Sequence, residues 1–367
     1  MSEQLGWCRY VYNRTLAARR DLWEQQQSVG YYETIQWLPG WKVEQPALKQ
    51  VHSQVLQDVH LRIDLAFKAF FRRVKAGEDP GYPRFKIEGR YDSMTYPQYR
   101  NGVVLVEGRL RLSKIGDIKI KLHRPIEGKV KTVVITRNRL GKWYACFSCE
   151  VESKPLLKTG KVVGIDLGLT TFATLSNATA IDNPRFFRRD EQTLAKAQRR
   201  YNRYKHEAGK ERSDEERRLA RKYGKVVCHI HQRITNRRTN FAHQRSRELV
   251  NAYELIAFEK LQIQDMMQHG KAKSKAQQRG LNKSMGDAAW RQLLTYTLYK
   301  AVEAGKVCVE VDPRGTTQRC SRCGLVVPKD LSVRIHDCPH CGLKIDRDLN
   351  AALNILALGM QSVGYDP

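Results

Sequence analysis

Two Cys-x-x-Cys pairs near the C-terminal end constrain the fold of this chain more than any other feature of its sequence. The pairs are Cys320/Cys323 and Cys338/Cys341, and the second begins after a spacer of fourteen residues. Glycine follows each pair. Four thiolates at this spacing close a tetrahedron around one Zn²⁺, and a closed shell of four sulfurs leaves no position for water. The sequence therefore predicts a structural zinc site rather than a catalytic one.

Three acidic residues stand at the edges of predicted rigid elements. Asp166 lies in the apolar run 161–170, which breaks at glycine and continues as 171–176, the pattern of two hairpin-paired strands. Glu259 closes a second apolar run, and Asp348 opens a predicted helix. Any one of these acids alone would more often be a helix cap or a salt-bridge partner. Their combination favours a two-cation phosphodiester nuclease, since Mg²⁺ takes hard oxygen ligands held on rigid structure.

The charge of the chain indicates a polyanionic partner. Its 367 residues carry a formal net charge of +27, and such an excess repels itself unless a polyanion offsets it, so we expect nucleic acid. A basic membrane-surface protein is the competing class. No apolar run approaches the roughly 18 residues of a spanning helix, and the first residues carry no signal-peptide pattern, so no membrane partner is expected. Nine cysteines, four of them in metal-type spacing, fit a reducing setting and predict a cytoplasmic protein.

Residues 1–78 are predicted to be helical. From Leu48 the apolar positions recur in steps of three and four up to a glycine stop at Gly77, which predicts one long helix. The opposite face of this helix carries Gln50, Gln54 and Gln57. Glutamines on such a face are most often solvated, but in a DNA-binding protein they can also pair with base edges.

Residues 79–155 are predicted to form a small antiparallel β-barrel or sheet, because a Pro-Gly-rich break ends the helix and strands with alternating apolar residues follow. On two predicted strands, apolar residues alternate with cations, so that one face is core and the other is basic. Phosphate contact is expected from this basic face, whose members are Arg109, Arg111, Lys119 and Lys121.

Residues 184–238 hold 18 Lys and Arg against seven Asp and Glu. Two helical stripes joined by a polar stretch at 207–213 predict a basic helical hairpin, inserted between the Asp166 strand and the Glu259 strand. A solvated charged surface is the common alternative, but the surplus of cations favours a nucleic-acid clamp. The contacts expected from this insertion are those of Arg199, Arg203, Arg233 and Arg237.

Taken in order, these parts resemble the TnpB family, the transposon-associated RNA-guided nucleases related to type V CRISPR effectors. The motifs that carry the resemblance are Gly-Ile-Asp-Leu-Gly at 164–168, Phe-Glu-Lys-Leu at 258–261, the two cysteine pairs, and Asp-Arg-Asp-Leu-Asn-Ala-Ala-Leu-Asn-Ile at 346–355. Further likeness at 9–13, 66–71 and 108–112 extends it over nearly the whole chain.

The resemblance implies an α/β multidomain fold. Its expected parts are a helical recognition lobe at 1–78, a wedge-like β-barrel at 79–155, a RuvC-type, RNase H-like nuclease domain at 156–318, a zinc ribbon at 319–343 and the C-terminal helix of the nuclease domain at 344–367. Family members begin with a basic strand upstream of the motif at 9–13, and only eight residues precede that motif here. Either the chain is shortened or its start is displaced, so the completeness of the barrel and the affinity for guide RNA stay open at this point.

The resemblance also implies the site and its partners. Asp166 would bridge two catalytic Mg²⁺ ions, Glu259 and Asp348 would hold one each, and the four cysteines would hold one structural Zn²⁺. Asp346 and Asp348 diverge by about 200° on a helix, so both cannot face one site, and the family pattern favours Asp348. The implied partners are a guide RNA from the transposon end and target double-stranded DNA. Gln57 is placed where the family contacts a short motif beside the target.

Two other classes of function stay open. The run Gly-Ile-Asp-Leu-Gly-Leu-Thr-Thr at 164–171 also looks like the first phosphate loop of sugar-kinase and chaperone ATPases, which share an RNase H-like core. Those enzymes need a second glycine-rich, Asp-containing loop downstream, and the sequence offers none. A protein that uses guide RNA to occupy DNA without cutting is the other class. Loss of one of the three acids would signal it, and all three are present.

Overall fold

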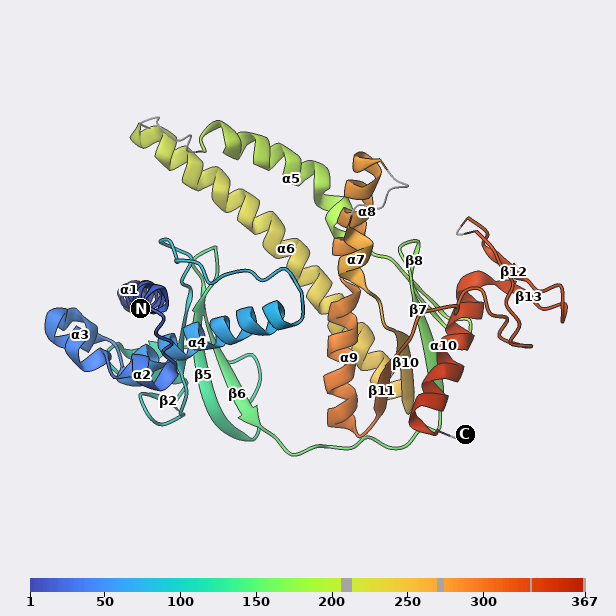
Figure 1. Cartoon of the computed structure of the whole chain (residues 1–367), viewed down its shortest axis with the longest axis horizontal. Coiled ribbons are helices and arrows are strands. Elements are labelled where there is room, and N and C mark those ends of the chain that lie inside the picture. The colour runs from blue at the N-terminus through green and yellow to red at the C-terminus, as the bar shows by residue number, and fades with distance from the viewer. Residues whose placement is uncertain (206–212, 269–273, 331, 366–367) are drawn as a thin grey trace. The chain divides into compact units, whose positions relative to one another are not determined.

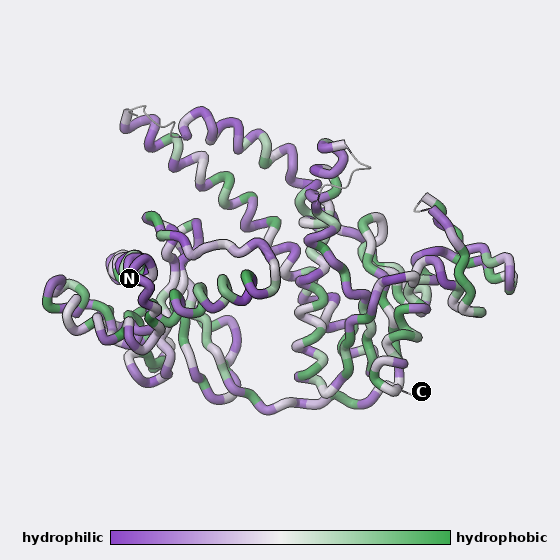
Figure 2. The backbone as a smooth tube through the Cα atoms, in the orientation of Figure 1, coloured by the Kyte–Doolittle hydropathy of each residue, from purple (hydrophilic) through white to green (hydrophobic). Residues whose placement is uncertain are grey.

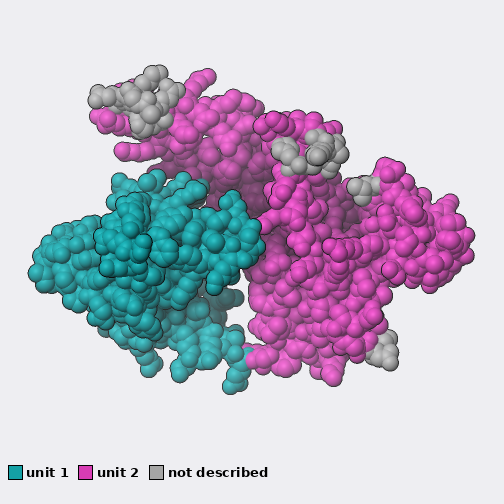
Figure 3. Space-filling model, viewed as in Figure 1, with its two compact units in different colours: residues 1–152 teal, residues 153–367 magenta. Residues whose placement is uncertain are grey.

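The computed structural model describes residues 1–205, 213–268, 274–330 and 332–365. The chain divides into two compact units, Met1–Glu152 and Ser153–Pro367, which are coloured separately in Figure 3. Across the described ranges, no helix combines the length and the apolar character needed to cross a membrane.

The first half of unit 1 is helical. It consists of α1 (Ser2–Glu24), α2 (Tyr31–Ile35), α3 (Leu38–Glu44), the 3₁₀ helix η1 (Pro46–Gln50) and α4 (Ser53–Lys75). Helices α1 and α4 pack together through a shared apolar core. The prediction of one helix starting at Leu48 is wrong, because Val51 takes an extended conformation with φ −104° and ψ 139° that separates η1 from α4. Gln50 therefore ends η1 and does not lie on the face of α4 with the other two glutamines.

The second half of unit 1 contains two three-stranded antiparallel sheets. One is β1 (Ser93–Tyr96), β5 (Lys129–Arg137) and β6 (Trp143–Glu150), and the other is β2 (Val103–Val106), β3 (Arg109–Leu112) and β4 (Gly116–Lys119). The predicted alternation on β3 is confirmed, since Leu110 and Leu112 are buried and the two arginines are exposed. No ladder in the described residues joins the two sheets, so a closed barrel stays a prediction.

Unit 2 is built on a mixed five-stranded sheet in the order β11-β10-β7-β8-β9. Its strands are β7 (Val162–Leu167), β8 (Thr171–Leu175), β9 (Ala180–Asp182), β10 (Leu255–Glu259) and β11 (Val307–Val311). Strand β10 pairs in parallel with both β7 and β11, whereas β7, β8 and β9 form an antiparallel meander. The predicted hairpin around Asp166 is confirmed, with Asp166 opposite Thr174.

Helices cover both faces of this sheet (Figure 1). Helices α6 (Asp214–Ala252) and α9 (Trp290–Ala304) share a core with one face of β7 and β10, and α10 (Arg347–Val363) packs on the other. Strands buried on both faces read as near-continuous apolar runs, which is why β7 and β10 were visible in the sequence. At Gly164 a Cβ atom would lie 2.1 Å from the Ala352 carbonyl oxygen, so α10 rests directly on the backbone of β7.

The basic segment forms a helical hairpin of α5 (Phe186–Arg203) and α6, as predicted. Leu194 and Ala197 of α5 pack against Ile230 and Ile234 of α6. The predicted linker at 207–213 lies outside the described residues except for Ser213, which caps α6. Helix α6 does not stop at residue 238 but runs on to Ala252, so one helix serves both the hairpin and the core of the sheet. Figure 2 shows α5 and the adjoining part of α6 as largely hydrophilic.

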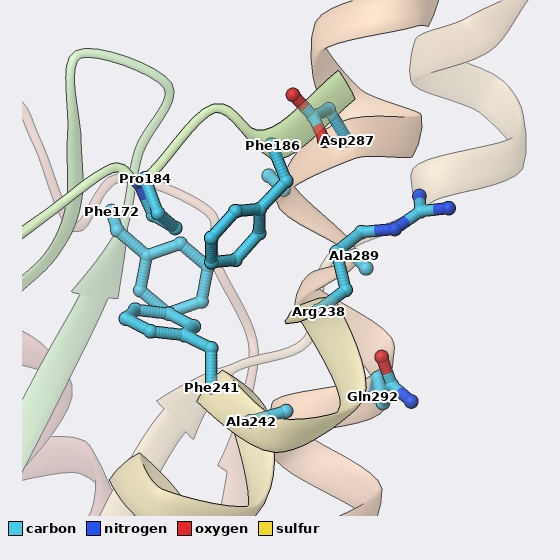
Figure 4. Close-up of a pocket in the computed structure, with 10 residues that line it drawn as sticks. Phe172, Pro184, Phe186, Arg238, Phe241, Ala242, Asp287, Ala289 and Gln292 are labelled. Carbon is cyan, nitrogen blue, oxygen red and sulfur yellow. The ribbon is translucent and has the colours of Figure 1, made fainter. Parts of the chain in front are cut away.

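The start of α5 is anchored by α8 (Lys275–Ala288), which follows the short helix α7 (Ile263–Met267). The carboxylate of Asp287 accepts hydrogen bonds from the backbone N–H groups of Phe187 and Arg188, at 2.8 and 3.3 Å. Beside it the rings of Phe172, Phe186 and Phe241 face one another in a small pocket (Figure 4). These contacts fix one end of the hairpin to the sheet.

Candidate active site

The side chains of Asp166 and Glu259 lie on the same face of the sheet, on the neighbouring parallel strands β7 and β10. Side chains alternate along a strand, so Asp166 shares the face of Gly164, which is the face that α10 covers. On β10, Ala257 packs with Ile355 of α10, and Glu259 lies two residues further along the same face. In the β7/β10 ladder Ile165 pairs with Phe258, so Asp166 and Glu259 each follow that pair by one residue.

Asp348 enters the same region from the first turn of α10. Residues four apart share a helix face, so Asp348 lies one turn before Ala352 and two before Leu356. The backbones of Ala352 and Leu356 are the atoms that contact Gly164. The face of α10 that rests on β7 therefore also carries Asp348. The structure thus brings all three predicted acids to one end of the sheet.

The electrostatics of the site agree with this placement. Burial, together with the charges of Glu259 and Asp348, raises the pKa of Asp166 to about 8. Burial and the charge of Asp348 also raise the pKa of Glu259 to about 7. Carboxyl groups with such shifts are held close to like charges in a poorly solvated place, which is an arrangement that a divalent cation relieves.

Two arginines that the sequence analysis did not single out contact Asp348. The Arg347 side chain donates from Nε and Nη2 to Oδ1 of Asp348 at 3.1 and 3.0 Å, and Nη1 of Arg334 lies 3.8 Å from Oδ2. The three carboxylates do not gather as tightly as metal ligands: in the described part of the chain, only the cysteine group has all its ligand atoms within 4.8 Å. For Arg347, the sequence did offer a signal, which is its position between the two aspartates of the 346–348 motif.

The four predicted cysteines meet in one cluster, which confirms their grouping. Sulfur–sulfur distances are 3.6 Å from Cys320 to Cys341 and 3.7 Å from Cys323 to Cys338. A tetrahedron with Zn–S bonds of about 2.3 Å has sulfurs about 3.8 Å apart, so the thiols already have the spacing of a zinc shell. In the sequence the four cysteines lie between β11 and α10, and the second pair lies between the two strands of the hairpin formed by β12 (Ile335–Asp337) and β13 (Lys344–Asp346).

Both cysteine pairs adopt the same turn. The N–H of Gly324 donates to the Cys320 carbonyl and that of Gly342 to the Cys338 carbonyl, each at 2.9 Å. The two glycines have φ of +75° and +70°, a region that side chains with a Cβ disfavour. Burial opposes charge on the Cys320 thiol, but hydrogen bonds from the N–H groups of Cys323 and Arg322 and from the side chains of His336 and Cys341 lower the pKa of Cys320 to about 5. The same cluster raises the pKa of Cys341 to about 12, so without a metal the negative charge is concentrated on Cys320.

The expected phosphate contacts of unit 1 lie on an exposed surface. Arg109, Arg111, Lys119 and Lys121 are all exposed. Arg111 forms an ion pair with Asp117 at 2.8 Å. Arg109 lies directly opposite Lys119 on the neighbouring strand, and like charges in that position repel each other.

The four arginines expected to contact nucleic acid from the hairpin fall into two kinds. Arg199 and Arg203 are exposed on α5. Arg233 and Arg237 of α6 instead reach Asp190 of α5, at 2.7 and 3.4 Å. Both of these side chains are still nearly half exposed, at 46% and 47%. They hold the two helices of the hairpin together, a role that the sequence did not indicate.

The three glutamines have different surroundings. Gln54 donates from Nε2 to Oε1 of Gln98 at 2.9 Å, which ties α4 to the loop after β1. Gln57 lies half-buried on α4, and Gln50 is exposed at the end of η1. The structure therefore groups Gln54 and Gln57 on one helix and leaves Gln50 outside it.

Comparison with known proteins places the chain among transposon nucleases. Family models match a helix-turn-helix domain of the OrfB/IS605 group at residues 1–28, the "Probable transposase" OrfB/IS605 model at 146–270 and the Cas12f1-like TNB domain at 290–355. A solved structure titled as a Cas12f1–sgRNA–target DNA complex aligns with a TM-score of 0.54 and 12% identity, over 96% of this chain and 81% of that one. That likeness shows a common fold.

Two relatives match over almost the whole chain. A Streptomyces pristinaespiralis protein named "Putative RNA-guided DNA endonuclease" is 34% identical, over 98% of this chain and 85% of the relative. The similarly named InsQ of Escherichia coli K12 is 31% identical, over 96% of this chain and 87% of the relative. With this identity over this length, the chain belongs to the TnpB family.

Proposed function

We propose that this protein is a transposon-encoded, RNA-guided DNA endonuclease that cuts target DNA beside a short adjacent motif. The observation that carries the proposal is the convergence of Asp166, Glu259 and Asp348 from β7, β10 and α10 at one end of the sheet. A three-stranded antiparallel meander extended by two parallel strands, with α10 on the acidic face, supports a RuvC-type, RNase H-like nuclease domain in unit 2. The names of the two long relatives support the same activity.

The residues of the acidic site fit divalent cations. Asp166, Glu259 and Asp348 supply carboxylate oxygens, which are the ligands that Mg²⁺ prefers. The raised pKa values of Asp166 and Glu259 reflect their burial and the charges of neighbouring carboxylates. Two bound Mg²⁺ ions would supply a Lewis acid at the scissile phosphate and a water of lowered pKa. Asp166 lies on the central strand of the sheet, and it would hold the ions together with Glu259 and Asp348. Burial around Asp166 keeps bulk water from competing with its ligation.

The cysteine cluster supports a structural Zn²⁺. Its four thiols have the spacing of a closed tetrahedral shell and none is left over for catalysis. The segment 319–343 would then be a zinc ribbon inserted before the last helix of the nuclease domain.

The basic surfaces support binding to RNA and DNA backbones. Arg109 and Lys119 repel each other across β3 and β4, a cost that a phosphate backbone offsets. Exposed Arg199 and Arg203, with Lys121, extend the phosphate contacts, and Gln57 is assigned to the adjacent motif. In this proposal 1–78 is the recognition lobe and 79–155 the wedge, and base pairing by the guide RNA reads the target.

The proposal is tested with Asp166→Ala in the full chain purified with its RNA. The variant should lose DNA cleavage in Mg²⁺ by at least 10³-fold, because it removes a metal ligand that acts on the reacting phosphate. It should bind guide RNA and target DNA within about twofold of the wild type, because no phosphate contact is removed. Cleavage by this variant would overturn the site. Equal binding without any cleavage by the wild type would instead identify a guide-dependent DNA-binding protein.

A further inference from the structure

Two asparagines lie on the buried face of α10. Asn350 is fully buried and Asn354 is 7% exposed, and their four-residue spacing puts them on one side of the helix. The rest of this helix is mostly apolar. A buried amide is costly unless its donors and acceptor are satisfied, so the partners of these two side chains are informative.

Both amides bind the backbone that carries the first cysteine pair. Asn350 donates from Nδ2 to the Arg319 carbonyl at 2.8 Å and accepts at Oδ1 from the Ser321 N–H at 2.9 Å. Asn354 donates to the carbonyls of Thr316 and Arg319 at 2.8 and 2.7 Å. Arg319 and Ser321 flank Cys320, so the Asn350 amide holds the chain on both sides of a zinc-ligand candidate.

The face of α10 that carries Asp348 points elsewhere. Asp348 and Asn350 are about 200° apart around the helix, so one side of α10 faces the acids while the other holds the cysteine loop. Ala352 and Leu356, on the side of Asp348, contact β7 at Gly164. A rotation or slide of α10 relative to the cysteine loop would therefore move Asp348 relative to Asp166.

We propose that Asn350 and Asn354 are positioning residues that couple the zinc site to the catalytic metal site, so that the cysteine loop sets where Asp348 stands. This inference rests on the proposed function, since it takes the three acids as ligands of divalent cations. The amides of both asparagines are hydrogen-bonded to the backbone of the cysteine loop, and neither residue is among the proposed metal ligands. Each acts through the axial position of α10, and Asn350 matters more because it is bonded on both sides of Cys320.

The coupling is reciprocal by linkage. If the cysteine loop holds Asp348 in place for Mg²⁺, then Mg²⁺ held by Asp348 must tighten the binding of zinc to the loop by the same factor. A residue that only fills space in the core would change stability without linking the two metals.

The chain offers a matched control in its other unit. Asn13 of α1 donates from Nδ2 to the Lys86 carbonyl at 3.0 Å and accepts at Oδ1 from the Lys86 N–H at 2.8 Å. It is a similar two-bond clamp between an asparagine and a backbone segment, and neither Asn13 nor Lys86 belongs to the cysteine cluster or to the three acids. Asn13→Ala therefore measures the effect of losing such a pair of hydrogen bonds away from the proposed metal sites.

The test uses the full chain, with Mn²⁺ as the probe of the acidic site and electron paramagnetic resonance to count free ion. Asn350→Ala should keep one zinc per chain by elemental analysis, yet weaken Mn²⁺ binding at least tenfold, which is about 1.4 kcal/mol. Asn354→Ala, which leaves the Ser321 bond in place, should have a smaller effect in the same direction. Asn13→Ala should leave Mn²⁺ affinity unchanged.

A second readout is the affinity for zinc, measured at equilibrium by competition with a colorimetric chelator. Saturating Mg²⁺ should tighten zinc binding by the wild type several-fold and should not change it in Asn350→Ala. Thermal melts establish that each variant is folded at the assay temperature, and if Asn350→Ala is not, Asn354→Ala serves in its place. Wild-type Mn²⁺ affinity in a folded variant, or a tightening of zinc binding by Mg²⁺ that persists in it, would overturn the inference.

The same titration separates this inference from the proposed function. If the wild type shows no Mn²⁺ binding that is lost in Asp166→Ala, then the assignment of the acidic site is wrong, and both the proposed function and the coupling are rejected. If that binding is present and Asn350→Ala shares it at full affinity, only the coupling is wrong.

Discussion

The carboxylate of Asp346 accepts hydrogen bonds from the backbone N–H of Asp348, at 2.8 Å, and from that of Leu349, at 3.1 Å. Asp346 is thus the N-cap of α10. Asparagine caps helices about as well as aspartate, because the side-chain oxygen is what accepts. The two aspartates of one motif therefore have separable roles.

Asp346→Asn should retain most DNA cleavage, whereas Asp348→Asn should lose at least 10²-fold, because only the second removes a charged ligand. Single-turnover cleavage in Mg²⁺ compares the two directly. The reverse ranking would mean that the metal ligand is Asp346.

Arg347 neutralises Asp348 through its two hydrogen bonds, and its charge also lowers the pKa of Asp166. A cation bound by these acids has to compete with that guanidinium. Arg347→Gln should therefore tighten Mn²⁺ binding several-fold in an electron paramagnetic resonance titration. Arg334→Gln, whose guanidinium lies farther from Asp348, should have a smaller effect. Weaker Mn²⁺ binding by Arg347→Gln would show that the arginine orients Asp348 rather than competing for it.

Because the pKa of Asp166 is raised, ionisation of its carboxyl destabilises the folded state when no metal is bound. Its carboxyl has a higher pKa in the folded state, about 8, than the ordinary value of 3.8, so the folded protein holds this proton more tightly. The resulting stability is present below pH 4 and is lost as the pH rises toward 8. Asp166→Asn, which never ionises, should raise the free energy of unfolding in Mg²⁺-free buffer at pH 8.5 by about 1–3 kcal/mol.

Urea denaturation at two pH values checks this sign. The difference between Asp166→Asn and the wild type should shrink at pH 5, where the wild-type carboxyl is protonated. A gain in stability that is larger at pH 5 than at pH 8.5 would contradict the assignment of Asp166 to a buried, negatively charged site.

Cys338→Ser should release zinc and loosen the start of α10. Structural zinc sites contribute on the order of 10 kcal/mol to local folding, and this one is bonded to α10 through the Arg319 carbonyl. Cys146→Ser is the matched control, because Cys146 is exposed on β6 and lies outside the cluster. Elemental analysis should find zinc lost from the first variant and kept in the second. Stoichiometric zinc in Cys338→Ser would count against a four-cysteine shell.

The sequence was sufficient for the elements that carry the site. Strands β7 and β10 are buried on both faces, so their apolar runs were continuous and their acids stood out at the ends. The cysteine spacing could be interpreted because metal geometry fixes it locally. The helical hairpin was visible from its apolar stripes, although α6 runs on beyond the basic segment because the same periodicity continues into the core of the sheet.

Other features depend on tertiary packing and could not be predicted. Arg233 and Arg237 looked like free cations, but the packing of α5 against α6 brings Asp190 beside them. The break at Val51 depends on how η1 and α4 enter a shared core, which periodicity does not describe. The hydrogen bonds of Asn350 join α10 to the loop around Cys320, which lies 29 to 31 residues earlier in the sequence. A lone asparagine in a helix does not reveal them.

The central claim is that a guide RNA directs cleavage at the acidic site. The most direct measurement is cleavage of one DNA in Mg²⁺ by the purified protein with a matching guide RNA, with a mismatched guide and without RNA. The account predicts cutting with the matching guide alone, and none when Asp166→Ala replaces the wild type. Equal cutting with a mismatched guide, or without RNA, would contradict it and leave a nuclease that reads DNA by itself or not at all.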